Sequence, residues 1–289
     1  MRNAIFLFLF LVINNVSLYA QYNEDQVEIF STNINGKTYS VVKMIHQNNR
    51  IKVKYFSVKD KSGLSSYLRY ESWAKNKNII AYMSAGYITD CASLYAHQVG
   101  LTIDNGEIIN SSISENLGGL AVIQNDEIKL FNLENPFLQI KDKDGVLVKF
   151  ELRNAFDRSL FIKWASENNI SAFQCHLLAQ NDSLLVYENA AKEIRDRRFL
   201  IGGVDQDGLF SNYILNLNGP ETLRDATKIA LKFLKSNDGL QAHYIINHDA
   251  GCDNIFRVFN ANGEPEKRRG FEGFVHISNA ASLIVFYYE

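Results

Sequence analysis

The sequence has few cysteines and none of the residue spacings that indicate a zinc site. Its three cysteines, Cys91, Cys175 and Cys252, are too few for a disulfide framework. Neither CxxC nor HExxH occurs, so we expect no bound metal and no cofactor. The chain also lacks a basic tract, and its net charge at pH 7 is -2. Nucleic acid is therefore not an expected partner.

Residues 1–20 predict a secretory signal peptide. Arg2 gives a positive start, Ile5–Ile13 form an apolar run, and Ala20 is a small residue at the expected cleavage position. The run is shorter than the roughly 20 apolar residues that cross a bilayer, which disfavours the alternative of an uncleaved membrane anchor. No lipobox cysteine follows. We therefore expect a secreted or periplasmic bacterial protein with no stable membrane insertion after cleavage.

The remainder of the chain has the composition of an ordinary globular protein, with 46% hydrophobic and 21% charged residues. No segment repeats with a period of about 20 to 50 residues. We expect residues 21–75 to add N-terminal strands and a helix to the same domain that residues 76–289 form.

Short runs rich in Val, Ile, Tyr and Phe, bounded by Asn, Asp and Gly turns, predict a chain made mostly of strands. They cover Val27–Ser31, Tyr39–Met44, Ile51–Val58, Ile79–Met83, Val99–Ile103, Leu120–Ile123, Ile128–Phe131, Val146–Leu152, Phe173–Leu178, Phe199–Val204, Phe210–Leu217, Ala242–Asn247, Phe274–Ile277 and Leu283–Tyr287.

Helical spacing of apolar residues predicts a helix over Glu221–Ser236, with Pro220 in its first turn and Gly239 as its stop. Weaker patterns predict helices over Asp157–Glu167 and Leu64–Ala74. A few helices that interrupt a long series of strands favour an α+β fold with mixed, largely antiparallel sheets.

Two strands end in turns of small residues, one at Ser84-Ala85-Gly86-Tyr87 and one at Asp249-Ala250-Gly251. Small residues let the backbone approach a ligand closely, and consecutive N–H groups there can hold an anion. The alternative is that both segments are tight turns between strands.

These two turns belong to a series of segments that resembles the phosphodiester glycosidase family, in the same order and over most of the mature chain. The other segments are the Val99–Gly106 hairpin, Ala172-Phe173-Gln174 with Leu177-Leu178, the strand Arg198–Gly202 with a turn at Asp207-Gly208, and the helix from Glu221. The resemblance implies the fold of that family and a hydrolase that cleaves a sugar, of the N-acetylglucosamine type, from a phosphodiester oxygen.

The chemistry of that reaction suits two of the matched residues as its catalytic pair. The leaving phosphate is a stable anion, and an arginine such as Arg198 binds phosphate with paired donors; the alternative is a surface arginine. The oxocarbenium-like centre favours a nearby carboxylate, for which we select Asp249 over the alternative of a turn residue. A second carboxylate could come from Glu71, Asp90, Asp205 or Asp253.

Five further residues are expected to bind the substrate, a glycan or cell-wall sugar phosphate: Ser84, Gly86, Gln174, Gly251 and His248. Ser84 and Gln174 have a structural role as their alternative, and His248 has that of an exposed loop histidine. Cys91 and Cys252 lie just beyond the two matched turns, which suggests a disulfide between them.

The chain departs from the family pattern at the site itself. Ser84 replaces an asparagine, Ala250 replaces the first glycine after Asp249, and Cys252-Asp253-Asn254 replaces small residues. These departures motivate the alternative function, a relative that binds sugar phosphates or glycans without hydrolysing them.

Overall fold

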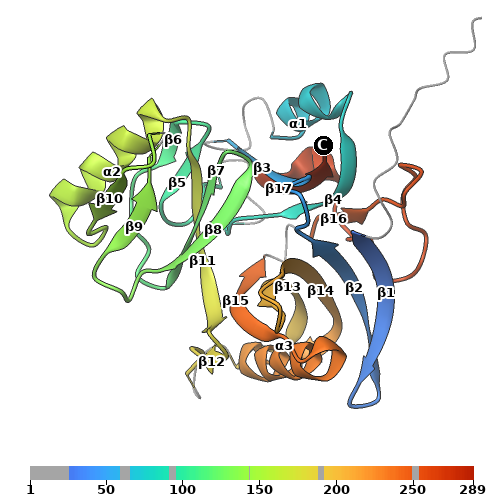
Figure 1. Ribbon diagram of the computed structural model, residues 1–289. Coiled ribbons are helices and arrows are strands. Elements are labelled where there is room, and N and C mark those ends of the chain that lie inside the picture. The colour runs from blue at the N-terminus through green and yellow to red at the C-terminus, as the bar shows by residue number, and fades with distance from the viewer. Residues whose placement is uncertain (1–25, 59–65, 91–95, 143, 188–191, 249–253) are drawn as a thin grey trace, which may run out of the picture.

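The computed structural model describes residues 26–58, 66–90, 96–142, 144–187, 192–248 and 254–289. The fold is α+β, as predicted, with largely antiparallel sheets and few helices (Figure 1). No helix in these ranges is long and apolar enough to span a membrane.

The largest sheet has eleven strands, and its main path runs β1-β2-β14-β13-β15-β11-β5-β6, with β12, β7 and β8 joined at the side. Neighbouring strands are antiparallel throughout. Their bounds are β1 Val27–Ile34, β2 Lys37–Ile45, β5 Thr102–Asp104, β6 Glu107–Asn110, β7 Gly119–Gln124, β8 Glu127–Asn132, β11 Ser171–Gln180, β12 Ser183–Leu184, β13 Arg195–Val204, β14 Phe210–Glu221 and β15 Gln241–His248.

A second sheet of four strands packs on one face of the first. Its order is β16-β4-β17-β3, with bounds β3 Ile51–Ser57, β4 Asn78–Ser84, β16 Phe256–Val258 and β17 Ser282–Tyr288. One apolar cluster joins the two sheets, with Leu200 and Ile246 on one side and Val53 and Phe286 on the other. Helix α1 (Ser66–Ala74) covers the outer side of the second sheet through Tyr70 and Phe56.

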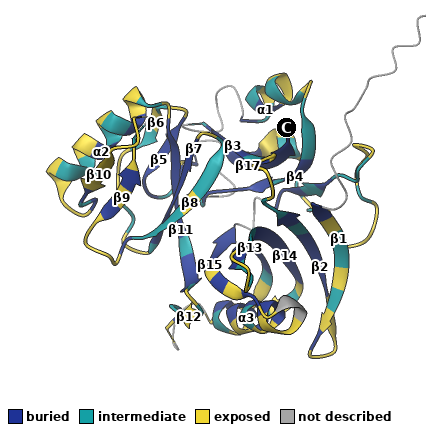
Figure 2. Cartoon of the chain, in the orientation of Figure 1, coloured by how far each residue is buried: buried dark blue, intermediate teal, exposed yellow. Residues whose placement is uncertain are grey.

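The opposite face of the large sheet is covered by helix α3 (Leu223–Asp238). Phe233 and Ala230 of this helix are fully buried against Ile201 and Ile245 of the sheet, and its outer side is exposed (Figure 2). Because successive strand residues point to opposite faces, Arg198 and His248 lie on the face toward the second sheet. Phe199 and Asn247 therefore lie on the α3 face.

A smaller lobe contains β5 to β8, the pair β9 (Leu138–Lys141) and β10 (Leu147–Phe150), and helix α2 (Ala155–Glu167). Figure 1 shows it beside the two-sheet body, with β11 running from one to the other. The first half of β11 pairs with β5 and β7, and its second half pairs with β15. The lobe is therefore joined to the body by β11, and also by Asp104 of β5, which accepts from Ser57 N of β3 and pairs with Arg69 of α1.

Two local predictions were wrong. Pro220 lies in the last residues of β14, because that strand stays paired as far as Glu221, which is opposite Arg195. The helix α3 consequently begins two residues later, with Thr222 as its N-cap. Phe274–Ile277 is not a strand; Phe274 is 86% exposed and a short 3-10 helix, η1, covers Ile277–Asn279.

Candidate functional site

The turn Ser84–Tyr87 comes at the end of β4 and is held by hydrogen bonds to residues at the starts of the two neighbouring strands, β16 and β17. Ser84 N–H donates to Ile255 O at 3.1 Å, and Gly86 N–H donates to Ser282 Oγ at 3.0 Å. A Cβ at Gly86 would lie 2.7 Å from Gln98 Oε1, closer than such contacts allow. Glycine at this position therefore allows the Gln98 amide to pack directly on the turn.

Arg198 lies near the start of β13 and is only 1% exposed. Its Nη1 donates to Ile255 O at 3.1 Å and its Nη2 donates to Asn254 Oδ1 at 2.6 Å. The guanidinium carbon lies 4.3 Å from the centre of the Phe256 ring. The alternative of a surface arginine is wrong, and the guanidinium is fixed against residues 254–256.

His248 ends β15, directly opposite Arg198, and is fully buried. Its Nδ1 lies 3.1 Å from Ala85 O, and because a carbonyl only accepts, Nδ1 carries the proton of the neutral ring. Burial, helped by the nearby positive charge of Arg198, lowers the pKa of His248 to about 4. At neutral pH the ring is thus uncharged, with an acceptor at Nε2. The alternative of an exposed loop histidine is wrong.

Four buried side-chain atoms around this turn have no hydrogen-bond partner in the part of the chain that the structure describes. They are His248 Nε2, Asn247 Oδ1 and both amide atoms of Gln98. Asn247 is otherwise bonded to the Tyr87 hydroxyl, which donates to Asn247 O at 3.1 Å. A buried polar group without a partner costs about 1–3 kcal/mol, so several at one place indicate a site rather than a core.

A cavity of about 380 Å³, which we call the His176 cavity, lies on the other face of the large sheet from Arg198 and His248. Its lining includes Leu178, Val186 and Leu223 of the α3 core. The His176 ring lines it and lies against Tyr87, with the ring centres 4.9 Å apart. Burial, helped by the positive charges of Arg195 and Arg197, lowers the pKa of His176 to about 4. The rest of the lining comes from Glu115, Asn116, Gly118, Asn132, Glu134, Leu177, Leu178, Leu185, Val186, Tyr187 and Leu223.

Sequence reasoning did not find several of these groups. His176 lies two residues after Gln174, inside a matched segment, so the sequence could have indicated it as a candidate site residue. Glu115 and Glu134 give the cavity two carboxylates, but they lie in loops of the lobe that no matched segment includes. Gln98 directly precedes the Val99–Gly106 hairpin and lies in none of the matched segments.

Gln174 is fully buried, and its amide bonds the backbone of the loop 111–117 to the sheet. Its Oε1 accepts from Leu101 N and Ser114 N, both at 2.8 Å. Its Nε2 donates to Ser114 O at 3.1 Å and to Leu117 O at 3.0 Å. These four bonds use the amide completely, which fits the structural role that was its alternative.

Several predicted residues fall outside the described ranges: Asp249, Gly251 and Asp253, and the proposed cysteine pair Cys91 and Cys252. Cys175 is a buried free thiol, and burial raises its pKa to about 12.

Two other carboxylates lie away from the turn. Asp205 accepts from Asp207 N and Leu209 N in the turn at the opposite end of β13 from Arg198. Glu71 lies on α1, where its Oε1 accepts from the Tyr67 hydroxyl. Within the described ranges, no three His, Cys, Asp or Glu side chains are grouped as a metal site.

No family model matches the chain, and no curated protein matches it. Among solved structures, one from Synechocystis, a hypothetical protein, is similar at a TM-score of 0.50 and 10% identity, over 91% of this chain and 62% of that one. A second similar structure is the catalytic domain of zebrafish N-acetylglucosamine-1-phosphodiester alpha-N-acetylglucosaminidase, auto-inhibited by its pro-peptide. Its TM-score is 0.49 and its sequence identity is 13%, and the match covers 91% of this chain and 82% of that one. A putative exported protein from Burkholderia pseudomallei has a TM-score of 0.45 and 8% sequence identity, and the match covers 86% of this chain and 73% of that one. The likeness concerns the fold alone.

Proposed function

We propose that the chain is a secreted hydrolase that cleaves a sugar from a phosphodiester at the anomeric carbon. One observation carries the proposal: the Ala85–Tyr87 turn, Arg198 and His248 come from three distant parts of the chain and meet around buried polar atoms that lack partners. These are the same segments in which the sequence resembles the phosphodiester glycosidases.

The reaction breaks the bond between the anomeric carbon and the phosphate oxygen, and a water oxygen replaces it. The phosphate departs as an anion and needs positive potential more than a proton. Arg198 supplies that potential from a fixed position, which avoids the cost of reorganising charge during the reaction. Because the guanidinium is buried, we assign it an electrostatic role and the fixing of residues 254–256.

Asp249 follows His248 directly in the sequence, and we propose its carboxylate as the group that faces the anomeric carbon. It would act as nucleophile, as base toward water, or as a stabiliser of the developing positive charge. His248 stays neutral at pH 7, so its Nε2 can accept a hydrogen bond from a sugar hydroxyl or the water.

The test measures sugar release by the secreted protein from a panel of sugar-1-phosphodiesters, including UDP-N-acetylglucosamine. Asp249→Asn should lower the rate about 100-fold or more, because it removes the charge of the carboxylate and leaves its size. Asp144→Asn is the matched control, since Asp144 is an exposed turn residue of the smaller lobe, and its rate should match wild type.

Equal rates for Asp249→Asn and wild type would remove Asp249 from the mechanism. A folded wild type that releases no sugar from any member of the panel would overturn the enzyme proposal. If that protein still bound sugar phosphates, the function would be the non-catalytic binding role.

A further inference from the structure

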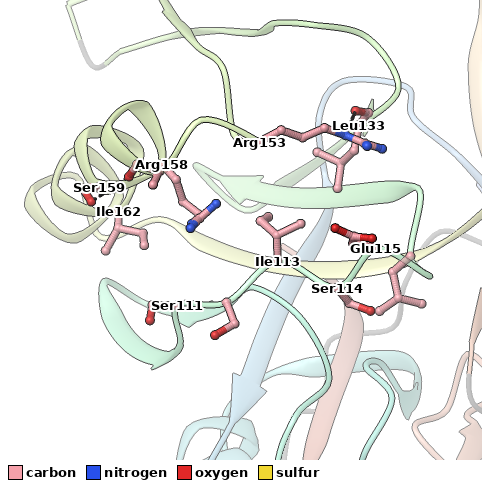
Figure 3. Close-up of a pocket in the computed structure, with 12 residues that line it drawn as sticks. Ser111, Ile113, Ser114, Glu115, Leu133, Arg153, Arg158, Ser159 and Ile162 are labelled. Carbon is pink, nitrogen blue, oxygen red and sulfur yellow. Dashed lines mark hydrogen bonds between the residues drawn. The ribbon is translucent and has the colours of Figure 1, made fainter.

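A second and larger hollow, of about 480 Å³, lies in the smaller lobe (Figure 3). It runs between the loop 111–115 and the first half of helix α2, and we call it the Arg158 cleft. Its size is typical of small-molecule sites, which measure about 300–1,000 Å³. It shares Glu115 with the His176 cavity, so the two hollows are neighbours.

Arg158 provides the positive charge of this cleft. Figure 3 shows its guanidinium extending from α2 toward the loop. Nη1 donates to Leu152 O at 3.1 Å, which fixes the group, and the described chain holds no carboxylate within ion-pair distance of it. The other arginine of the cleft, Arg153, is instead bonded to Glu134 at 2.7 Å. Arg158 thus retains donors for an anion.

The remaining lining suits a sugar ring. Ile113 lies at the centre of the cleft, where its apolar side chain can pack against the C–H face of a ring (Figure 3). The hydroxyls of Ser111, Ser112 and Ser114 make no hydrogen bond within the described ranges and can pair with sugar hydroxyls. Glu115, at the other end from Arg158, can accept from hydroxyls but would repel an anion.

The charge therefore differs from one end of the cleft to the other. We infer that the Arg158 cleft binds a sugar that carries an oxyanion, with the oxyanion on Arg158 and the hydroxyls toward the serines and Glu115. Phosphate and carboxylate both match the paired donors of a guanidinium. Gln174 gives this site its rigidity, because its amide bonds Ser114 and Leu117 to the sheet.

The inference goes beyond the proposed function, since it concerns another site and needs no turnover. Binding is therefore measured by calorimetry in the Asp249→Asn protein, and failure of the hydrolase proposal would leave the result interpretable. The ligands are N-acetylglucosamine-1-phosphate, glucuronate, neutral N-acetylglucosamine and sodium phosphate.

Arg158→Gln should weaken the binding of at least one charged sugar about tenfold or more, because it removes a charged, paired donor. Lys163→Gln is the matched control: Lys163 lies on the same helix, outside the cleft, so its loss changes the net charge equally. Arg158→Lys should restore part of the affinity. Which of the two charged sugars loses affinity identifies the oxyanion as phosphate or carboxylate.

Equal affinities in Arg158→Gln and Lys163→Gln would overturn the inference. So would tight binding of neutral N-acetylglucosamine that Arg158→Gln leaves unchanged, because the charge would then have no part. Binding of sodium phosphate as tightly as the sugar phosphate would reduce the site to a plain anion site and overturn the assignment of a sugar. The melting temperature of each variant confirms that it is folded.

Discussion

At the scale of single residues, two buried histidines couple the stability of the protein to pH. Burial lowers the pKa of His176 and of His248 to about 4, against about 6.5 in an unfolded chain. Between these values the unfolded chain binds protons that the folded chain does not. The stability that these residues contribute is therefore complete above about pH 6.5 and is lost as the pH falls toward 4.

Asp104 changes the stability in the opposite direction over this pH range. Burial raises the pKa of its carboxyl group to about 6, although Arg69 Nη1 lies 2.7 Å from Asp104 Oδ2. Two histidines outweigh one carboxylate, so we expect the free energy of unfolding to rise between pH 4.5 and 6.5. Urea titrations at several pH values measure this rise. The double variant His176→Gln/His248→Gln should show a smaller rise, and an unchanged rise would exclude the histidines as its source.

The candidate site was only partly predictable at this scale. The sequence located Arg198, His248 and the Ser84–Tyr87 turn, because each lies next to a strand end in a matched segment. It could not show that Arg198 and His248 are buried, since burial comes from the second sheet packing over them. Nor could it show the role of Gln174, whose partners lie about 60 to 73 positions away.

At the scale of elements, helix α3 shows how capping sets a boundary that periodicity does not. Thr222 Oγ accepts from Asp225 N at 3.1 Å, and Gly239 ends the helix in the left-handed conformation at φ 62°. The predicted stop at Gly239 is confirmed. The predicted start was wrong by two residues. Pro220 suits the first turn of a helix, but β14 remains paired with β13 as far as Glu221, so the helix begins only after it.

Thr222→Ala should lower the free energy of unfolding by about 1 kcal/mol, because the amide of Asp225 loses its acceptor. Chemical denaturation measures this change. Ser236→Ala on the same helix is the control: its hydroxyl donates back to Lys232 O, so its loss should cost less than about 0.5 kcal/mol. Equal costs for the two variants would argue against the cap.

The strands themselves were largely predictable, since most of the predicted runs correspond to observed strands. The strands that were missed are short, such as β6, β9 and β16, and carry too few residues for a pattern. The sequence does not predict which strands pair with one another. No local pattern indicates that β2 pairs with β14 or that β3 pairs with β17, because these partners lie far apart in the chain.

At the scale of the whole molecule, the interface between the two sheets holds the fold together. Phe286 of β17 is fully buried in the cluster that joins them. Phe286→Ala should therefore cost about 3–5 kcal/mol of stability, because it leaves a cavity that the sheets cannot close. Phe274→Ala removes the same ring from a position that is 86% exposed and should change stability by less than about 0.5 kcal/mol. Thermal or urea unfolding of both variants tests the comparison, and similar losses would contradict it.

The pairing of β3 with β17 has a consequence for when the protein can fold. Ser57 and Ala281, at the ends of this pair, are joined by a hydrogen bond although they lie 224 positions apart in the chain. β3 pairs with β17 and with no other strand of its sheet, so during synthesis it emerges long before its partner. Until then the second sheet is incomplete and Arg198 and His248 have no cover. The second sheet can therefore form only after β17 has been made.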